Sequence, residues 1–254
     1  MNPLWYATRA TGEVAFLLLT AALVFGTLTA ARFGGRRLPR FVVAGLHRNL
    51  SLVSLVFLGG HLLTAIVDPF AGLGVTDAVL PFGADYRPLW VGLGAIGLDL
   101  VLALVVTSLL RERLGQRTWR LLHWAAYGCW LAALLHALGT GTDTRTTIGM
   151  LLAGSAAGAA LLAIGWRLAA GRPDRAGARL TLAALGMVTV LLVFAWTLTG
   201  PLAPGWARRA GTPANLLGGS APAGRPAVRP GAGQVPSAIP VPSTGDRDDG
   251  GGAE

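Results

Sequence analysis

Histidine is the residue type in this sequence best suited to bind a metal ion, and its four copies stand in two matched pairs. They are His47, His61, His123 and His136. The first two are 14 residues apart and the last two are 13 apart. On an α-helix these spacings correspond to about 21 Å and about 19.5 Å along the axis. Each pair lies in an apolar run, where an unpaired imidazole is costly. Two parallel helices could therefore present level imidazole pairs at two depths, and such pairs can ligate two haem irons.

The helices that would hold these histidines follow from the composition of the chain. Of its 254 residues, 53% are hydrophobic and 13% are charged, which is too apolar for a soluble domain of this length. Runs of about 20 apolar residues can cross a bilayer, and they must be helical there because lipid offers no partner to the backbone. We therefore predict an all-α integral membrane bundle of six transmembrane helices over residues 1–202. The six predicted spans are 12–31, 46–67, 89–110, 119–139, 147–168 and 179–200.

The charged residues indicate orientation and not a surface that binds nucleic acid. The net charge is +9, all basic residues are arginines, and they cluster in short segments between apolar runs. This pattern is typical of topology signals, so we expect membrane lipid and no nucleic acid as a partner. The arginine-rich connections, 32–40, 111–120 and 167–179, are predicted to be cytoplasmic. Both termini then lie on the extracytoplasmic side of the plasma membrane.

Residues 203–254 form a predicted disordered tail. The composition changes there to Gly, Pro, Ala and Ser, with an acidic cluster at the end. Such a segment buries too little apolar surface to offset the entropy lost when it is ordered.

One stretch matches the dinucleotide-binding fingerprint in its residue types but not in its structural context. It is Gly92-Leu-Gly94-Ala-Ile-Gly97. The fingerprint works as a turn between a strand and a helix, whereas here it lies inside a predicted span. Small residues in a membrane helix allow a neighbouring helix to pack closely, which is the interpretation we favour.

The second and fourth spans are separated by one hairpin and therefore run parallel. His47 should then be level with His123, and His61 should be level with His136. One feature of the spacing is unfavourable, because an ideal helix places His123 and His136 about 140° apart around its axis. The fourth span is therefore expected to be wound irregularly or tilted, near Gly128.

Two other functions also suit an apolar chain with four histidines. A transporter or metal-ion permease could use them to bind a transition metal, although such a pathway usually adds carboxylates, cysteine or methionine and broken helices. A structural or assembly protein could carry them as hydrogen-bonded packing residues.

With these residues the chain resembles the ferric reductase-like transmembrane domain family. That family includes the membrane part of NADPH oxidases and ferric reductases, and the MsrQ-type haem subunits. The resemblance covers about residues 11–143 and rests on the histidine spacing and on three neighbouring stretches. They are Thr11-Gly12, Thr107-Ser108-Leu-Leu-Arg111 and Trp119-Arg-Leu-Leu-His123-Trp-Ala-Ala-Tyr127.

The resemblance implies two b-type haems that pass single electrons across the membrane, as part of an oxidoreductase. No residue of this chain is expected to be catalytic itself. His47 and His123, here called the inner pair, would hold one iron, and His61 and His136, the outer pair, the other. NADPH oxidases and ferric reductases continue into flavin- and nicotinamide-binding domains, for which nothing after residue 200 is suited. The expected donor is therefore a separate cytoplasmic flavoprotein or quinol, and the extracytoplasmic acceptor is open. MsrQ-type subunits lack one of the four histidine positions, so membership of that subgroup is also open.

Haem propionates are anions, and four arginines are candidates to neutralise them. Arg48 and Arg120 are placed for the inner haem, and Arg87 and Arg145 for the outer haem. Each of them could equally be a topology signal or a contact to lipid headgroups.

Asp99 lies near the middle of the third predicted span. An ionised carboxylate is costly at that depth, so we expect Asp99 to face the bundle and to be protonated or paired. It would move protons or tune the potential between the haems, or it would be a hydrogen-bonded structural acid.

Overall fold

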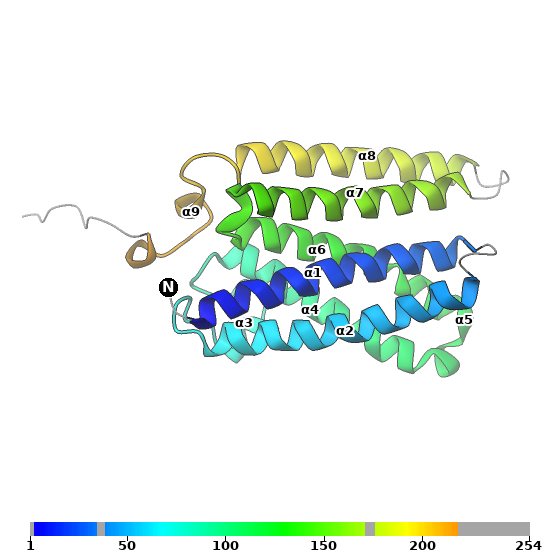
Figure 1. Cartoon of the computed structure of the whole chain (residues 1–254), viewed down its shortest axis with the longest axis horizontal. Helices are drawn as coiled ribbons and strands as arrows, with labels where there is room; N and C mark the ends of the chain where they lie inside the picture. The colour runs from blue at the N-terminus through cyan, green and yellow to red at the C-terminus, as the bar shows by residue number, and fades with distance from the viewer. Residues whose placement is uncertain (1–2, 35–38, 171–175, 218–254) are drawn as a thin grey trace, which may run out of the picture. The chain divides into compact units, whose positions relative to one another are not determined.

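The computed structural model describes residues 3–34, 39–170 and 176–217, and all regular structure in these ranges is helical (Figure 1). Five single helices are long and apolar enough to cross a membrane, and a sixth crossing is possible through a bent pair of helices. The predicted all-α membrane bundle is thus confirmed. The five helices are α1 (Pro3–Ala30), α2 (Arg40–Val67), α4 (Pro88–Leu109), α7 (Thr147–Ala169) and α8 (Ala176–Thr199), and the bent pair is α5 (Arg111–His123) with α6 (Ala125–Thr140).

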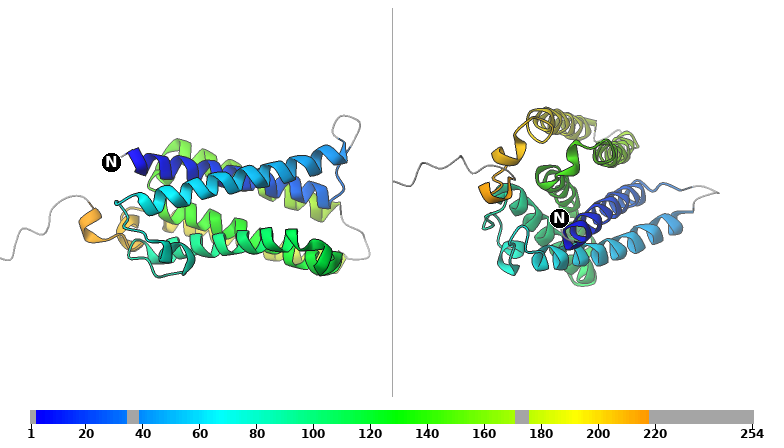
Figure 2. Two further views of the ribbon diagram at one scale, coloured as in Figure 1. Left: turned by 90° about the horizontal axis from the view of Figure 1, so that it is seen from below. Right: turned by 60° about the vertical axis from the view of Figure 1, so that its left-hand side comes forward.

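Two pairs of helices make the most extensive contacts, and the pair formed by the blue α1 and the cyan α2 can be followed in Figure 2. Helix α1 lies along α2, and α4 lies along α6, while α7 packs on α1. Helix α2 makes extensive contacts with α1 alone, and only Val43 and Ser54 on it are buried. Most side chains of α2 are therefore not buried, although His47 and His61 contact α1 through hydrogen bonds to the carbonyls of Ala22 and Thr8.

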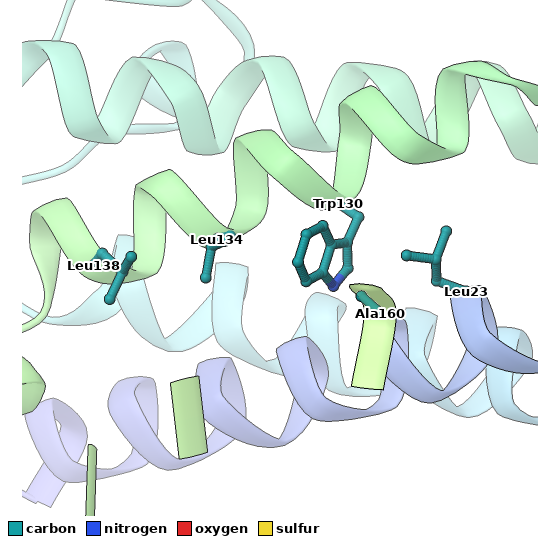
Figure 3. Close-up of a cluster of buried hydrophobic side chains, with 5 residues drawn as sticks. All are labelled: Leu23, Trp130, Leu134, Leu138 and Ala160. Atoms are coloured by element: carbon teal, nitrogen blue, oxygen red, sulfur yellow. The ribbon is translucent and has the colours of Figure 1, made fainter. Parts of the chain in front are cut away.

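A cluster of buried side chains joins α1, α6 and α7 (Figure 3). The indole of Trp130 is buried within it, and its Nε1 donates a hydrogen bond of 2.9 Å to Oγ1 of Thr20. Burying an indole is favourable only when its N–H finds a partner, as this one does. His136 comes two residues after Leu134, so on a helix it points about 200° away from the cluster, toward α4. The cluster consists of Leu23, Trp130, Leu134, Leu138 and Ala160.

The fourth predicted span is bent by 40° between α5 and α6. The irregularity was expected near Gly128, and that position is wrong, because the break lies at Trp124. There the amide of Trp124 bonds to the carbonyl of Leu121 at 3.2 Å, and the amide of Tyr127 bonds to the carbonyl of Trp124 at 3.1 Å. These bonds span three residues instead of four, which tightens the winding and redirects the helix.

The predicted disordered tail is wrong for residues 203–217, which are folded. The amide of Arg87 donates to the carbonyl of Gly211 at 3.1 Å, and the ring of Trp206 lies 5.3 Å from that of Trp90. Aromatic burial of this kind is a local feature that the average composition of the tail conceals. Residues 218–254, the remainder of the predicted tail, lie outside the described residues. The folded part contains α9 (Trp206–Arg209) and a short 3-10 helix (Ala214–Leu216).

Two short elements complete the end of the bundle that carries the N-terminus and α9 (Figure 1). They are α3 (Val75–Val79) and the 3-10 helix η1 (Asp143–Arg145). Helix α3 packs on α4, and η1 packs on α7.

Candidate functional site

The structure brings the four histidines together as two pairs. The ring centroids of His47 and His123 are 6.2 Å apart, and those of His61 and His136 are also 6.2 Å apart. The rings within a pair are nearly perpendicular, at 90° and 79°. The level pairing that the spacing predicted is therefore present, and the bend at Trp124 explains how α5 and α6 can turn both of their histidines toward α2.

The separation of the rings suits a single metal ion between them. A metal–imidazole bond of about 2 Å, with about 1.2 Å from nitrogen to ring centroid, places two opposed imidazoles about 6 Å apart. Within the described ranges, no three His, Cys, Asp or Glu side chains lie close enough to hold a bare metal ion. A pair of imidazoles supplies two nitrogens, and the porphyrin of a haem supplies its own four, so the residues present fit haem iron better than a free ion.

Hydrogen bonds fix the tautomer of three of the four rings. A carbonyl oxygen can only accept, so Nδ1 carries the proton in each of them and Nε2 keeps a lone pair. This is the arrangement of a metal-ligating histidine, whose second ring nitrogen is held by a backbone carbonyl. The three bonds, each 2.8 Å long, run from His47 to Ala22, from His61 to Thr8 and from His136 to Trp90.

The fourth ring, His123, has different surroundings. Its Nδ1 is buried and has no hydrogen-bond partner among the described residues. The ring stacks on the indole of Trp119, with centroids 4.8 Å apart and planes 26° apart. The inner pair therefore has one ring that a carbonyl holds and one that an aromatic ring holds.

A cavity of about 330 Å³ opens between α1, α2, α4 and α6 at the outer pair. Both His61 and His136 line it, together with mainly apolar side chains such as Leu58 and Leu98. Its volume and apolar lining are typical of sites for small molecules and cofactors. Arg9 and Asp143 lie in its lining, so the wall also carries charged groups.

Arg87 was a candidate to neutralise an anion at the outer site, and the structure contradicts that role. Its side chain is only 2% exposed and is not part of the cavity lining. Nη1 donates to the carbonyl of Gly139 and Nε to Oγ1 of Thr212, both at 2.9 Å. Burial lowers the pKa of Arg87, because removal from water disfavours the charged guanidinium. Arg87 instead holds the segment after α8 against the ends of α4 and α6.

The other three candidate arginines lie on the surface. Arg48, Arg120 and Arg145 are exposed, and none makes a hydrogen bond or ion pair with another described residue. Their role toward haem propionates stays a prediction. An exposed arginine near a span end is equally suited to lipid headgroups.

Sequence reasoning missed Arg9, the basic residue that does line the outer cavity. Its guanidinium pairs with the carboxylate of Asp143 at 2.6 Å and lies 4.9 Å from the ring centre of Trp5. The signal was available, since Arg9 is the only basic residue in the first 30 positions. It was overlooked because it precedes the first predicted span.

A second missed contact supports the bend beside the inner pair. Nη1 of Arg167 donates to the hydroxyl of Tyr127 at 2.5 Å, and this hydroxyl lies 3.3 Å from Oγ1 of Thr27. The same guanidinium lies 4.6 Å from the ring centre of Trp124. Arg167 thus ties α7 to α6 directly after the residue at which the fourth span bends.

The prediction that Asp99 faces the bundle is wrong, because its side chain is exposed. The inward face of α4 is set by Gly97, whose carbonyl accepts a weak bond of 3.5 Å from Sγ of Cys129 on α6. Asp99 follows two residues later and so points about 200° away from that contact. It lies on the face of α4 opposite α6.

Replacing Asp99 by asparagine is therefore expected to leave the content and the redox potential of any haem bound between the histidine pairs unchanged. The substitution removes a charge that lies on the outer surface of α4, remote from the face that carries Gly94 and Gly97. Spectroscopic redox titration of the purified variant beside the parent protein would measure this. A shift of either potential would show that the carboxyl group acts across the helix.

Comparison with known protein families gives a match over the part of the chain that holds three of the four histidines. Residues 11–134 match the family model described as "Ferric reductase like transmembrane component". The match includes His47, His61 and His123 and ends two residues before His136. Searches of curated proteins and of solved structures gave no match.

Proposed function

We propose, from the premise that residues 11–134 belong to the ferric reductase-like transmembrane family, that this chain is a di-haem b protein of an oxidoreductase. Domains of this family are membrane components of oxidoreductases and generally bind haem. The chain would move single electrons across the bilayer between an external donor and an external acceptor. The observation that carries the proposal is the pairing of the four histidines, with 6.2 Å between ring centroids at both levels.

Each bound haem would supply reversible one-electron chemistry at its iron. His47 and His123 would hold the inner haem, and His61 and His136 the outer haem. The carbonyl groups that accept from Nδ1 keep three rings in the tautomer whose Nε2 can bind iron, and they keep those rings from rotating. The chain's own contribution is thus to hold the ligands in place before the cofactor arrives.

The wall between the two levels is apolar. Between His47 and His61 the sequence is mostly Leu, Val, Phe and Gly, over about 21 Å of helix. Such a wall offers no ligands to ions and little water, so it favours electron movement over ion leakage. Arg9, in the lining of the outer cavity, is suited to an anionic propionate there.

The arginine-rich ends of the helices support an orientation with the inner pair near the cytoplasm of a plasma-membrane protein and both termini outside. A separate flavoprotein, or quinol from the membrane, would then deliver electrons at the inner pair. The acceptor would be reached on the extracytoplasmic side.

Purified protein from haem-replete cells is expected to show two b-type haems per chain. Reduced-minus-oxidised spectra identify the haem type, and pyridine haemochrome against a protein assay gives the ratio. A colourless preparation, or a ratio near one, would contradict the di-haem proposal. Metal analysis of the same sample would reveal a transition metal without porphyrin, as the permease alternative requires.

A further inference from the structure

We propose that Gly12, Gly26 and Gly94 are positioning residues of the haem sites. His123 has no such glycine, so the histidine ligands of the two haems are unequal in electron-donor strength. Each glycine opens a backbone carbonyl to one histidine ring. This inference rests on the proposed function, because it concerns the ligands of the two haems. The three glycines lie on helices that carry none of the histidines they serve.

The same local geometry occurs three times. In each case a histidine bonds through Nδ1 to the carbonyl of one residue, and the glycine stands four positions after that residue. Four positions are one helical turn, so the glycine lies directly beside the accepting carbonyl. The three sets are Ala22 and Gly26 with His47, Thr8 and Gly12 with His61, and Trp90 and Gly94 with His136.

Only glycine is compatible with this approach. In an α-helix the Cα–Cβ bond tilts toward the N-terminus, so a side chain covers the carbonyl one turn before it. A Cβ atom on Gly94 would lie 2.5 Å from Nδ1 of His136. On Gly12 it would lie 2.8 Å from Nδ1 of His61, and on Gly26 it would lie 2.9 Å from Cε1 of His47. Carbon atoms pack at about 3.5–4 Å, so each ring would have to move away from its carbonyl.

The glycines of α1 repeat the spacing of the histidines of α2. Gly12 and Gly26 are 14 residues apart, and so are His47 and His61. The two helices lie side by side in opposite directions, so the first glycine meets the second histidine and the second glycine meets the first. We call each set of an accepting carbonyl and the glycine one turn after it a cradle for the histidine ring. Because the two helices share a 14-residue period, α1 can offer α2 two equal cradles at two depths.

His123 lacks this cradle. No glycine among the described residues approaches its ring, and its buried Nδ1 has no hydrogen-bond partner there. A hydrogen bond from Nδ1 to a carbonyl makes Nε2 a stronger electron donor to a metal, which favours the oxidised iron. The outer haem would thus have two strengthened ligands and the inner haem one.

The test compares glycine-to-alanine variants at cradle and control positions in the full-length holoprotein. Gly94→Ala and Gly12→Ala are each expected to remove the outer haem, or to raise its midpoint potential, and to leave the inner component as in the parent protein. Gly26→Ala should act on the inner component alone. Gly59→Ala and Gly128→Ala are matched controls in the histidine-bearing helices, since a Cβ atom there meets no atom within 4 Å.

Haem content, redox titration and the electron paramagnetic resonance of the ferric haems are the measurements. Loss of both haems from Gly94→Ala and Gly12→Ala would mean general misfolding and would overturn the site-specific proposal. So would equal behaviour of cradle and control variants in a parent protein that holds two haems. A parent protein without two haems would instead overturn the proposed function, so the two failures are distinguishable.

Discussion

In the proposed di-haem arrangement, replacement of His61 by alanine is expected to remove one haem and to leave the other. His136 would then be the only histidine left to hold the outer haem, whereas the inner pair lies about 21 Å away along α2 and would keep both rings. The pyridine haemochrome ratio should fall by about half. The haem component that disappears should be the same one that His136→Ala removes.

The pairing of the histidines gives this prediction its sharpest control. His47→Ala and His123→Ala should both remove the inner component. A double variant within one pair should resemble either single variant, and a double variant across the pairs, such as His47→Ala with His61→Ala, should bind no haem. Loss of the same component from His47→Ala and from His61→Ala would contradict the arrangement.

Replacement of Arg87 by methionine is expected to destabilise the fold strongly, and much more than replacement of the exposed Arg145. Methionine can fill much of the buried volume, but it cannot donate to the carbonyl of Gly139 or to the hydroxyl of Thr212. Two hydrogen bonds from a charged donor, at about 1.5–3 kcal/mol each, indicate a loss of about 3–6 kcal/mol. Thermal unfolding in detergent, followed by near-ultraviolet dichroism, would measure the change.

Arg145→Met is the matched control for this experiment. Arg145 is at the same end of the bundle but exposed, and surface substitutions of that kind change stability by about 0.5 kcal/mol or less. Equal destabilisation by the two variants would show that the buried hydrogen bonds of Arg87 are not the cause. The outer haem can also be measured in Arg87→Met after partial heating. Its loss at a lower temperature than in the parent protein would show that the segment after α8 protects the outer pair.

The sequence predicted which side chains meet better than it predicted which way others point. The pairing of His47 with His123 depended on depth alone, and the structure places these rings together. The prediction for Asp99 depended on the rotation of a helix, and that for Arg87 depended on the path of a loop. Both were wrong, because Asp99 is exposed and Arg87 is buried away from the outer cavity. A polar residue in an apolar run indicates that its side chain needs a polar partner or an exposed position. The run itself does not determine toward which face of the helix the side chain points.

Two features were within reach of the sequence and were missed. The 14-residue period of Gly12 and Gly26 equals that of His47 and His61, and adjacent antiparallel helices would make it meaningful. Trp206 is a large aromatic residue just beyond the last span, in a segment that average composition assigned to the tail. The glycine period was not recognised at all, whereas Trp206 was interpreted as an anchor at the membrane interface and not as a packing partner of Trp90.

By itself, the sequence determined that the chain is a helical membrane bundle and that its histidines occupy two depths. Both properties depend on quantities that add along the chain, namely apolar length and the constant rise of about 1.5 Å per residue. Only the tertiary structure decided the rotation of the helices, the bend at Trp124, the carbonyl partner of each imidazole and the place of Arg87. Rotation accumulates at about 100° per residue and changes at every irregularity, so it is set by contacts between helices that no single segment encodes.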